Sequence, residues 1–242
     1  MGTSADRTPG SGGAWTPLKY ATASYVRGLG SGDVRQRDRA LRVLARHVPV
    51  LGGAGAAAGS ASAGRAGMQR LGGLLAGMGG PGLAPTLEAL GLAELVGRDR
   101  FDVLDGLVTL LAGDGDDLDS QAARDAACDV LDEVFADADT WQDLAAATVT
   151  RDDMQALLEM FLARYIYNRM PVIAERLGRL TDQQAARQAD ADMRQLITDL
   201  VALRLPEDPF TIDWAGSQGR QIADDAIGAV YETLEALDGS DE

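Results

Sequence analysis

Apolar residues recur at intervals of three and four through most of the chain after residue 33, which is the spacing of one buried helix face. The strongest stretch follows Thr150-Arg151-Asp152-Asp153, a capping-box-like helix start. Its apolar positions form one broad face: Met154, Leu157, Leu158, Phe161, Leu162, Tyr165 and Ile166. We expect this helix to lie at the centre of the core and to end or kink at Pro171.

Further helices are expected on both sides of it. The same periodicity predicts helices over residues 34–48, 83–95, 101–111, 120–134, 183–201 and 217–237. Asp33 is a candidate cap for the first, and Asp119 or Ser120 for the fourth. The segment 206–214 alternates apolar and polar residues and fits a short strand or an extended strap. The predicted fold is all-α, a helical bundle.

Two segments depart from this pattern. Residues 1–32 are rich in Gly, Ser, Thr and Pro and predict a flexible arm, with one or two helical turns near residues 20–27. Residues 51–80 carry many glycines, each of which costs a helix about 1 kcal/mol relative to alanine. A helix there needs contacts with the rest of the protein or with a partner.

The predicted organisation has four parts. They are a flexible arm over 1–32, a basic Gly/Ala-rich helical segment over 33–80, an acidic α-helical domain over 81–237, and a disordered tail over 238–242.

Composition supports a helical globular protein with divided charge. The chain has 242 residues, of which 46% are hydrophobic and only 5% aromatic, a balance that suits helices packed through small aliphatic side chains. The net charge is -15, yet the first 80 residues contain ten basic side chains and three acidic ones. Either each end meets a different partner, or the basic third packs on the acidic body.

The sequence lacks the residues that most catalytic and membrane functions require. His47 is the only histidine and Cys128 the only cysteine, too few for a zinc site; we expect Cys128 to be buried in a helix. The glycine clusters do not match a phosphate-binding loop. There is no 18-residue apolar run and no signal-peptide pattern, which predicts a cytoplasmic protein. We therefore expect a non-catalytic protein.

Acidic residues leave one enzymatic alternative open. Residues 114–119 alternate carboxylates, but a calcium-binding EF-hand loop requires Gly and Glu where this chain has Asp119 and Asp125. We interpret the run as a solvated turn before a helix. A carboxylate-based hydrolase would instead require Asp114, Asp116 and Asp152 to converge on one pocket.

The amino terminus carries a distinct chemical feature. Gly2 follows the initiator methionine, and small second residues generally permit removal of that methionine. The glycine α-amine would have an ordinary pKa of about 7.7 to 8, so it is partly neutral and nucleophilic at the pH of a cell.

Several segments together resemble the QatB family, a component of the bacterial Qat anti-phage system. They are Met1 to Ser4 with the glycine-rich spacer, Thr16-Pro17-Leu18, the Gly/Ala/Arg segment 52–80 and the run 161–166. The resemblance implies three partners: a QueC-like modifying enzyme, a P-loop ATPase and a TatD-like nuclease. It also implies that the QueC-like enzyme attaches a deazaguanine to Gly2, with Thr3 and Ser4 as recognition context. No other cofactor is expected.

The basic, aromatic-containing first third is the candidate partner-binding region. An aromatic residue in an otherwise polar arm can anchor it in a partner's groove. The candidate residues are Trp15, Pro17, Leu18, Arg35, Arg39 and Arg42. A nucleic-acid-binding module that uses the same arginines is the alternative, since guanidinium groups also bind phosphates.

Overall fold

The computed structural model describes residues 13–29 and 35–239, and all regular structure in these ranges is helical. They contain twelve α-helices and three short 3-10 helices, which confirms the all-α prediction. The segment 206–214 is not a strand; it is mostly irregular and contains the 3-10 helix η4 (Pro209–Thr211). None of the helices in the described ranges combines the length and hydropathy needed to cross a bilayer.

The chain divides into two compact units that interleave along the sequence. Unit 1 contains residues 1–60, 170–200 and 227–242, and unit 2 contains residues 61–169 and 201–226. This division differs from the predicted boundary at residue 80, because the basic Gly/Ala-rich segment contributes to both units. The chain consequently passes from one unit to the other at four places.

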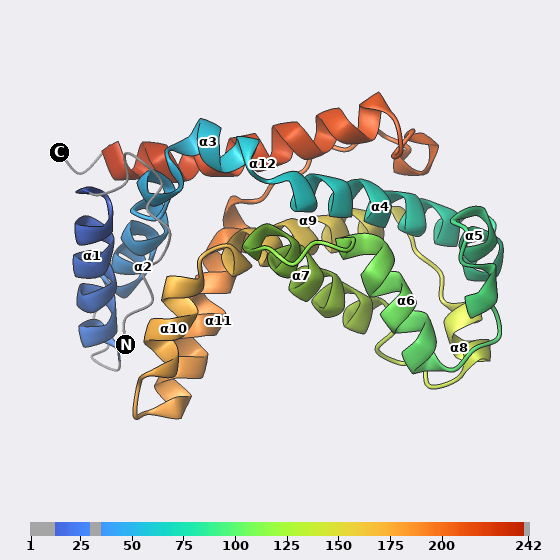
Figure 1. Ribbon diagram of the computed structural model, residues 1–242, viewed down its shortest axis with the longest axis horizontal. Helices are drawn as coiled ribbons and strands as arrows, with labels where there is room; N and C mark the ends of the chain where they lie inside the picture. The colour runs from blue at the N-terminus through green and yellow to red at the C-terminus, as the bar shows by residue number, and fades with distance from the viewer. Residues whose placement is uncertain (1–12, 30–34, 240–242) are drawn as a thin grey trace. The chain divides into compact units, whose positions relative to one another are not determined.

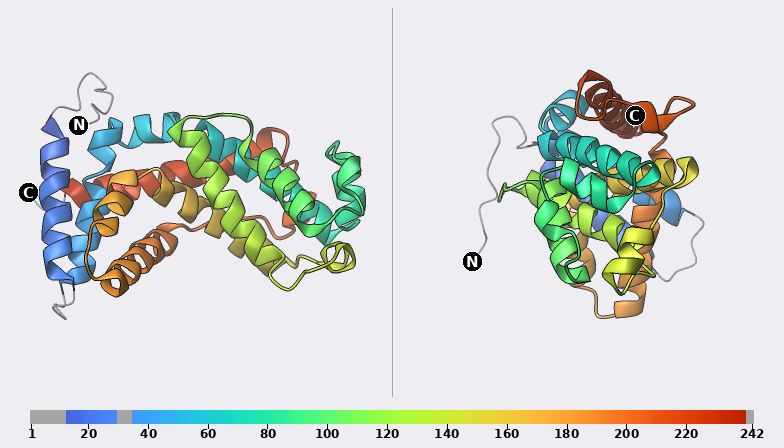
Figure 2. Two further views of the ribbon diagram at one scale, coloured as in Figure 1. Left: turned by 60° about the horizontal axis from the view of Figure 1, so that its bottom comes forward. Right: turned by 90° about the vertical axis from the view of Figure 1, so that its right-hand side faces the viewer.

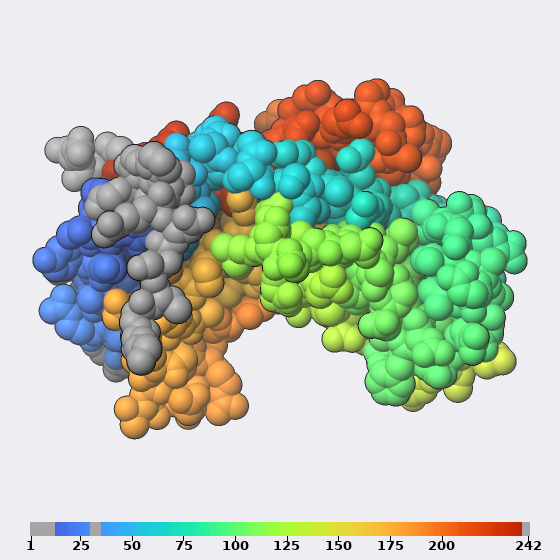
Figure 3. Space-filling view, viewed as in Figure 1, coloured from blue at the N-terminus to red at the C-terminus, as the bar shows by residue number. Residues whose placement is uncertain are grey.

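Unit 1 combines the first helices of the chain, two helices from its later part and the end of α12. Its elements are α1 (Trp15–Gly28), α2 (Gln36–Ala45), η2 (Val48–Leu51), α3 (Ala54–Gly59), α10 (Pro171–Gly178), α11 (Gln183–Leu200) and the part of α12 (Ser217–Gly239) from residue 227 onward. The blue helices α1 and α2 lie side by side (Figures 1 and 2). The orange atoms of α10 and α11 form one continuous surface (Figure 3).

Helix α1 occupies half of the segment that we expected to be an arm over residues 1–32. The predicted one or two turns near 20–27 are a helix of 14 residues. Its inward face carries Leu18, Ala21, Thr22 and Tyr25, which recur at helical intervals and are buried. Thr and Ser residues lie next to these positions in the sequence, yet burial of this face stabilises the helix. The remainder of that prediction, residues 1–12 and 30–32, lies outside the described residues.

Unit 2 is built around the helices α4, α7 and α9. Its elements are α4 (Ser62–Gly79), α5 (Leu83–Ala89), η3 (Ala93–Leu95), α6 (Arg100–Ala112), α7 (Leu118–Val134), α8 (Trp141–Ala146), α9 (Arg151–Asn168), η4 and the first part of α12. Helix α4 contacts α6, α7 and α9 (Figure 1). The most extensive contact between two helices of this unit is that of α7 with α9. Helix α9 begins and ends as predicted, and its apolar face lies in the core.

The glycines of α4 let aromatic rings lie directly on its backbone. The pairs are Gly64 with Tyr165, Gly67 with Phe161, Gly72 with Trp214 and Gly79 with Phe210. At each position a Cβ atom would overlap the ring that lies there. The tertiary contacts that we expected a glycine-rich helix to need are therefore supplied within unit 2, by side chains from α9 and from the segment before α12.

Side-chain caps fix where several helices begin. Thr150 and Asp153 form the predicted capping box of α9, and Thr140 and Asp143 form a second at the start of α8. Helix α7 is capped by Asp117, which accepts a hydrogen bond from Ser120 N at 2.7 Å. The predicted caps Asp119 and Ser120 were wrong, because both residues already lie inside the first turn of that helix.

Cys128 is exposed rather than buried. Its neighbours Ala126, Ala127 and Val130 form the inward face of α7, and Cys128 lies on the outward side of that face. Partial burial and the nearby carboxylates, Asp125 first among them, raise the pKa of its thiol. The thiolate is therefore disfavoured.

Candidate functional site

A groove between α1 and α2 brings together several of the predicted binding residues. The two helices pack through Leu18 and Tyr25 of α1 and through the apolar residues Ala40, Val43 and Leu44 of α2, all of them buried. Because these residues fill the inward faces, the polar side chains of both helices border the groove. It has a volume of about 420 Å³ and lies wholly within unit 1.

Three arginines of α2 line one side of this groove. Arg39, Arg42 and Arg46 are spaced at three and four residues, so they share one face of the helix. Helix α1 contributes Pro17, Tyr20, Ala21 and Ser24. Among the described residues, the lining itself includes no carboxylate, although Asp238 pairs with one of its arginines, Arg46. The groove therefore places three arginines near the aromatic ring of Tyr20.

The arginines are held in place by specific contacts. The Nε atom of Arg46 lies 2.7 Å from the Oδ1 atom of Asp238 in α12. The guanidinium of Arg39 lies against Gly28, at the end of α1, where a Cβ atom would overlap it. Glycine at position 28 thus lets Arg39 approach the end of α1 closely.

The structure separates the predicted binding residues. Pro17, Arg39 and Arg42 line the groove, whereas Arg35 is exposed at the start of α2 and is not part of the lining. Trp15 is half-buried at the start of α1. Gly2, Thr3 and Ser4 lie outside the described residues.

Leu18 is corrected from a partner-binding residue to a core residue. Its side chain is 0% exposed. Leu18 shares the inward face of α1 with the buried residues Ala21, Thr22 and Tyr25. A partner does not reach that face. The sequence around Leu18 is rich in Thr, Ser and Pro, which we took as typical of a flexible arm, so the helical spacing of its apolar residues was missed.

Tyr25 is a buried polar group beneath the same hairpin. Its hydroxyl donates to the backbone oxygen of Ala189 in α11 at 3.2 Å. Burial, with the charge of Asp192 nearby, raises the pKa of Tyr25 to about 12. This hydroxyl consequently stays protonated and stabilises the packing of α1 on α11.

The carboxylates of the hydrolase alternative do not converge. Asp114 and Asp116 precede α7, while Asp152 lies in the first turn of α9. The two helices run antiparallel, since residue 119 near the start of α7 contacts Tyr165 near the end of α9. Asp152 is therefore about 24 Å along the pair from the other two. Within the described ranges, no group of three or more His, Cys, Asp or Glu residues could hold a metal ion.

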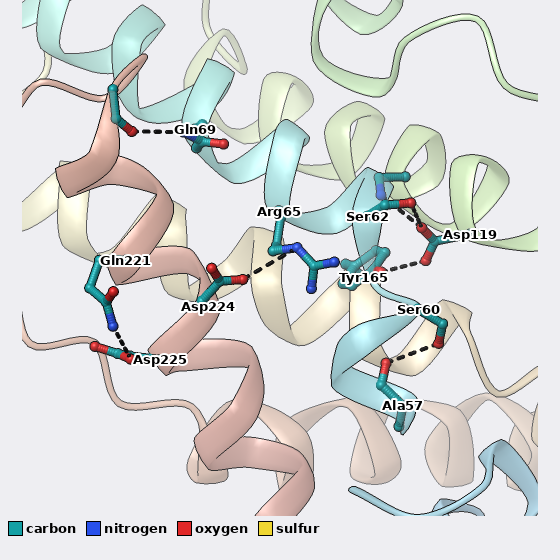
Figure 4. A network of polar contacts seen from close by, with 12 residues as sticks. Ala57, Ser60, Ser62, Arg65, Gln69, Asp119, Tyr165, Gln221, Asp224 and Asp225 are labelled. Carbon is teal, nitrogen blue, oxygen red and sulfur yellow. Dashed lines mark hydrogen bonds and ion pairs between the residues drawn. The ribbon is translucent and has the colours of Figure 1, made fainter. Parts of the chain in front are cut away.

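Asp119 contacts four residues, and the sequence did not indicate this role. It accepts hydrogen bonds from the Tyr165 hydroxyl at 2.5 Å and from Ala63 N at 2.7 Å (Figure 4). Ser62 Oγ also donates to it, at 3.2 Å, and the Nε atom of the buried Arg169 lies 3.2 Å away. These partners lie at least 46 residues away along the chain, so no local motif could reveal them.

Asp119 contacts residues next to two of the four places where the chain passes from one unit to the other. Ser62 and Ala63 directly follow the first passage into unit 2, and Arg169 is the last residue before the chain leaves it. One carboxylate therefore ties both chain segments to α7 within unit 2.

Comparison with known families identifies the chain. A family model described as Qat anti-phage system associated protein QatB matches residues 52–234, about three quarters of the sequence. The chain belongs to the QatB family. It is accordingly a component of an anti-phage defence system. Searches of curated proteins and of solved structures found no match.

The QatB match covers unit 2 completely and unit 1 in part. Helices α1 and α2, with the groove between them, precede residue 52 and lie outside the matched range. The family match therefore supports membership through the helical body, while the groove must be interpreted from its own chemistry.

Proposed function

We propose that this QatB-family chain is a non-catalytic, cytoplasmic component of a Qat defence assembly and that Gly2 is the acceptor for a deazaguanine conjugated by a QueC-like partner. Family membership carries the proposal. The separation of Asp114 and Asp116 from Asp152 supports a non-catalytic role, since it removes the acid and base pair that a carboxylate hydrolase requires.

The chemistry of amines favours Gly2 over other sites. A neutral amine is the nucleophile in such a conjugation: it forms the new bond to the deazaguanine, loses a proton and displaces the activating group. An α-amine has an ordinary pKa of about 7.7 to 8, against about 10.4 for a lysine amine, so more of it is neutral at pH 7. Lys19 is the only lysine in the sequence and the only competing amine.

Partner binding is proposed at the basic hairpin of α1 and α2. Trp15 and Arg35 flank the groove residues Pro17, Arg39 and Arg42. The QueC-like enzyme must hold the segment that leads into α1 while Gly2 is in its active site, and α1 is the first described α-helix after Gly2 in the sequence. The ATPase and the TatD-like nuclease are further proposed partners in the same assembly.

Mass spectrometry of protein coexpressed with its QueC-like partner tests the conjugation. We expect the intact mass to rise by one deazaguanine adduct and fragmentation to place it on Gly2. Lys19→Arg should leave the adduct in place, because it removes only the competing amine. An adduct that disappears with Lys19→Arg, or an unmodified amino terminus in a system that still protects against phage, would contradict the proposal.

Two substitutions at the acceptor sharpen the result. Gly2→Glu retains the initiator methionine, because that residue is removed only ahead of small side chains, and it should abolish the adduct. Gly2→Ala still permits methionine removal and leaves an α-amine that differs by one methyl group. Loss of the adduct in both variants assigns the specificity to glycine itself; loss in the first alone assigns it to a small terminal residue exposed by removal of the methionine, since the retained methionine also carries an α-amine.

A further inference from the structure

A groove in unit 2 lies where the end of α7 meets the first turns of α9, and we call it the α7/α9 groove. Its volume is about 490 Å³. Helix α9 lines it from Asp153 to Arg164, α7 contributes Glu133 and Val134, and the loop before α9 contributes Val149. All of these residues belong to unit 2 and to the range that matches the QatB family. The groove is therefore part of the helical body through which the chain matches that family.

Helix α9 carries a second apolar stripe that lines this groove. The stripe consists of Ala156, Leu157 and Met160, at the spacing of one helix face. Leu158 and Phe161, on the core face of the same helix, are 0% exposed, whereas Ala156 is exposed and Met160 is half-buried among the described residues. Apolar side chains on more than one face are typical of a helix that is packed on more than one side. The accessible part of this stripe is therefore suited to a partner.

Two carboxylates border one end of the groove. Glu133 lies in the last turn of α7 and Asp153 in the first turn of α9, and both side chains are exposed. Because the two helices run antiparallel, these two turns lie at the same end of the pair. Asp153 accepts its hydrogen bonds from Thr150, a neutral residue, and they lower its pKa. The carboxylate of Asp153 is consequently ionised at neutral pH.

Two arginines near the groove pair with other carboxylates. The Nε atom of Arg164 lies 3.4 Å from the Oδ2 atom of Asp129. The Nη2 atom of Arg100 lies 3.9 Å from the Oδ1 atom of Asp132. Neither pair includes a carboxylate of the groove lining.

The segments that form the groove are acidic as a whole. Residues 129–139 and 148–164 contain eight acidic residues, against three basic ones when Arg100 is included. An excess of one sign of charge around a groove attracts ligands of the opposite sign. The favoured occupant is therefore both apolar and cationic.

We infer that the α7/α9 groove binds an amphipathic helix of another protein, one whose apolar face is flanked by lysine or arginine. Its apolar face packs on Ala156, Leu157 and Met160, and its basic side chains approach Glu133 and Asp153. Laying an apolar helix face into a groove is a common mode of peptide recognition. The flexible side chain of Met160 can adapt to the shape of such a partner.

The form of the site indicates a helix rather than a small molecule. The lining follows α9 from Asp153 to Arg164, which corresponds to about 16 Å or three helical turns. Small-molecule sites combine an apolar lining with a few polar groups that converge on the ligand. Here the carboxylates are exposed at one end of an apolar stripe. An elongated partner with separate apolar and basic positions fits this arrangement.

This inference goes beyond the proposed function, because the groove shares no residue with the basic hairpin of α1 and α2 and does not involve Gly2. Binding of a peptide to the full-length chain alone can therefore succeed or fail independently of the conjugation.

Fluorescence anisotropy with three labelled peptides provides the test. The first is a leucine and lysine peptide of about 14 residues, three to four turns, with its leucines on one helix face. The second has the same residues in scrambled order, and the third has glutamate in place of each lysine. We expect the first peptide to bind at least tenfold more tightly than either of the others, because it alone combines an apolar face with positive charge.

Variants locate the binding. Ala156→Gln should weaken binding of the basic amphipathic peptide about tenfold, because the longer side chain fills the groove; the position is exposed and glutamine is a good helix former, so the fold is retained. Glu133→Lys should also weaken it about tenfold by reversing a charge at the groove. Asp116→Lys is the matched control, because it changes the net charge equally at an exposed residue that precedes the opposite end of α7. Its effect should be less than about twofold.

Four results would overturn the inference. Equal affinity for the ordered and scrambled basic peptides would show that charge alone attracts them. Equal losses in Asp116→Lys and Glu133→Lys would show that the binding does not depend on this groove. Self-association of the wild-type chain in sedimentation, removed by Ala156→Gln, would identify a second copy as the occupant. Absence of peptide binding by a wild-type chain with native circular dichroism would exclude a site for a basic helix.

Discussion

The two units differ in how they carry charge. Unit 1 contains 12 basic and 13 acidic residues, whereas unit 2 contains 10 basic and 24 acidic residues, so nearly all of the net charge belongs to unit 2. The predicted contrast between a basic first third and an acidic remainder becomes a contrast between two interleaved units. Unit 1 is therefore close to neutral, and unit 2 is strongly acidic.

The glycines of helices α3 and α4 have different surroundings. In α3 of unit 1, Gly55 has nothing near the position where a Cβ atom would lie. In α4 of unit 2, Gly64 and Gly72 admit the rings of Tyr165 and Trp214. Glycine therefore leaves open space in α3 and admits aromatic rings in α4.

The largest effect is expected from breaking the Asp119 cluster in unit 2. Asp119→Ala leaves Arg169 and the Tyr165 hydroxyl without their shared acceptor, and Arg169 is only 5% exposed. We expect a loss of about 3 kcal/mol in the free energy of unfolding, as for other broken buried pairs. Denaturant titration measures it.

The surface pair of Arg65 and Asp224 is the control for this prediction. Its atoms lie 3.3 Å apart and the Asp224 side chain is 46% exposed. Asp224→Ala should cost less than about 1 kcal/mol, because water screens an exposed ion pair. Equal losses in the two variants would show that Asp119 is an ordinary surface residue.

Neighbouring glycines of α4 should respond with opposite signs. Gly72→Ala places a methyl group into the ring of Trp214, which we expect to cost about 2 kcal/mol through overpacking. At Gly73 the nearest atom, Cβ of Trp214, is 3.9 Å away, so Gly73→Ala should stabilise the helix by about 0.5 to 1 kcal/mol. Thermal unfolding of both variants measures the difference. A rise in melting temperature for both would contradict the close-packing account.

The capping box of α9 predicts an acid-sensitive contribution in unit 2. Hydrogen bonds from the side chain and backbone of Thr150 lower the pKa of Asp153 below its ordinary value of 3.8. The stabilisation is present above pH 4 and is lost as the pH falls through the folded-state pKa, because the unfolded chain takes up the proton first. Thr150→Ala should cost about 1 kcal/mol at neutral pH.

Unfolding curves between pH 2 and 7 check this prediction. The stability difference between wild type and Thr150→Ala should shrink toward the acid end. A difference that does not change with pH would mean that the hydroxyl acts without Asp153.

The smallest neutral-pH effect is expected in unit 1, at Tyr25. Tyr25→Phe removes one hydrogen bond to Ala189 and should cost about 0.5 kcal/mol in the free energy of unfolding.

The same hydroxyl predicts a dependence on alkaline pH. The raised pKa of about 12 means that Tyr25 retains its proton in the folded state at a pH where the unfolded state has lost it. The stabilisation is therefore complete below pH 10 and is lost as the pH rises toward 12. Absorbance titration of tyrosinate, compared with Tyr25→Phe, should isolate one group that ionises near pH 12; ionisation near pH 10 would show that Tyr25 is not buried.

Local patterns in the sequence were enough to predict much of the helical body. Helix α9 could be predicted because its cap, its apolar period and Pro171 all lie within one short stretch. Helix α1 was largely missed, because small polar residues between its apolar positions resemble a linker. The glycine contacts of α4 could not be located, since the rings that fill them come from distant segments.

The candidate site was only partly predictable. Arg39 and Arg42 could be selected because helical spacing alone puts them on one face, but their pairing with Tyr20 depends on how α1 packs. Leu18 was misjudged for the same reason. Asp119 and the interleaving of the two units depend on contacts between distant residues, which periodicity does not encode.

Phage plating on cells that carry the complete defence system tests the central claim most directly, namely that the chain acts through its amino-terminal glycine while unit 2 is its scaffold. Strains with wild-type protein, Gly2→Glu and the scaffold control Gly73→Ala should be compared at equal protein levels. The account predicts full protection with wild type and Gly73→Ala and loss of protection with Gly2→Glu. Full protection with Gly2→Glu would contradict it.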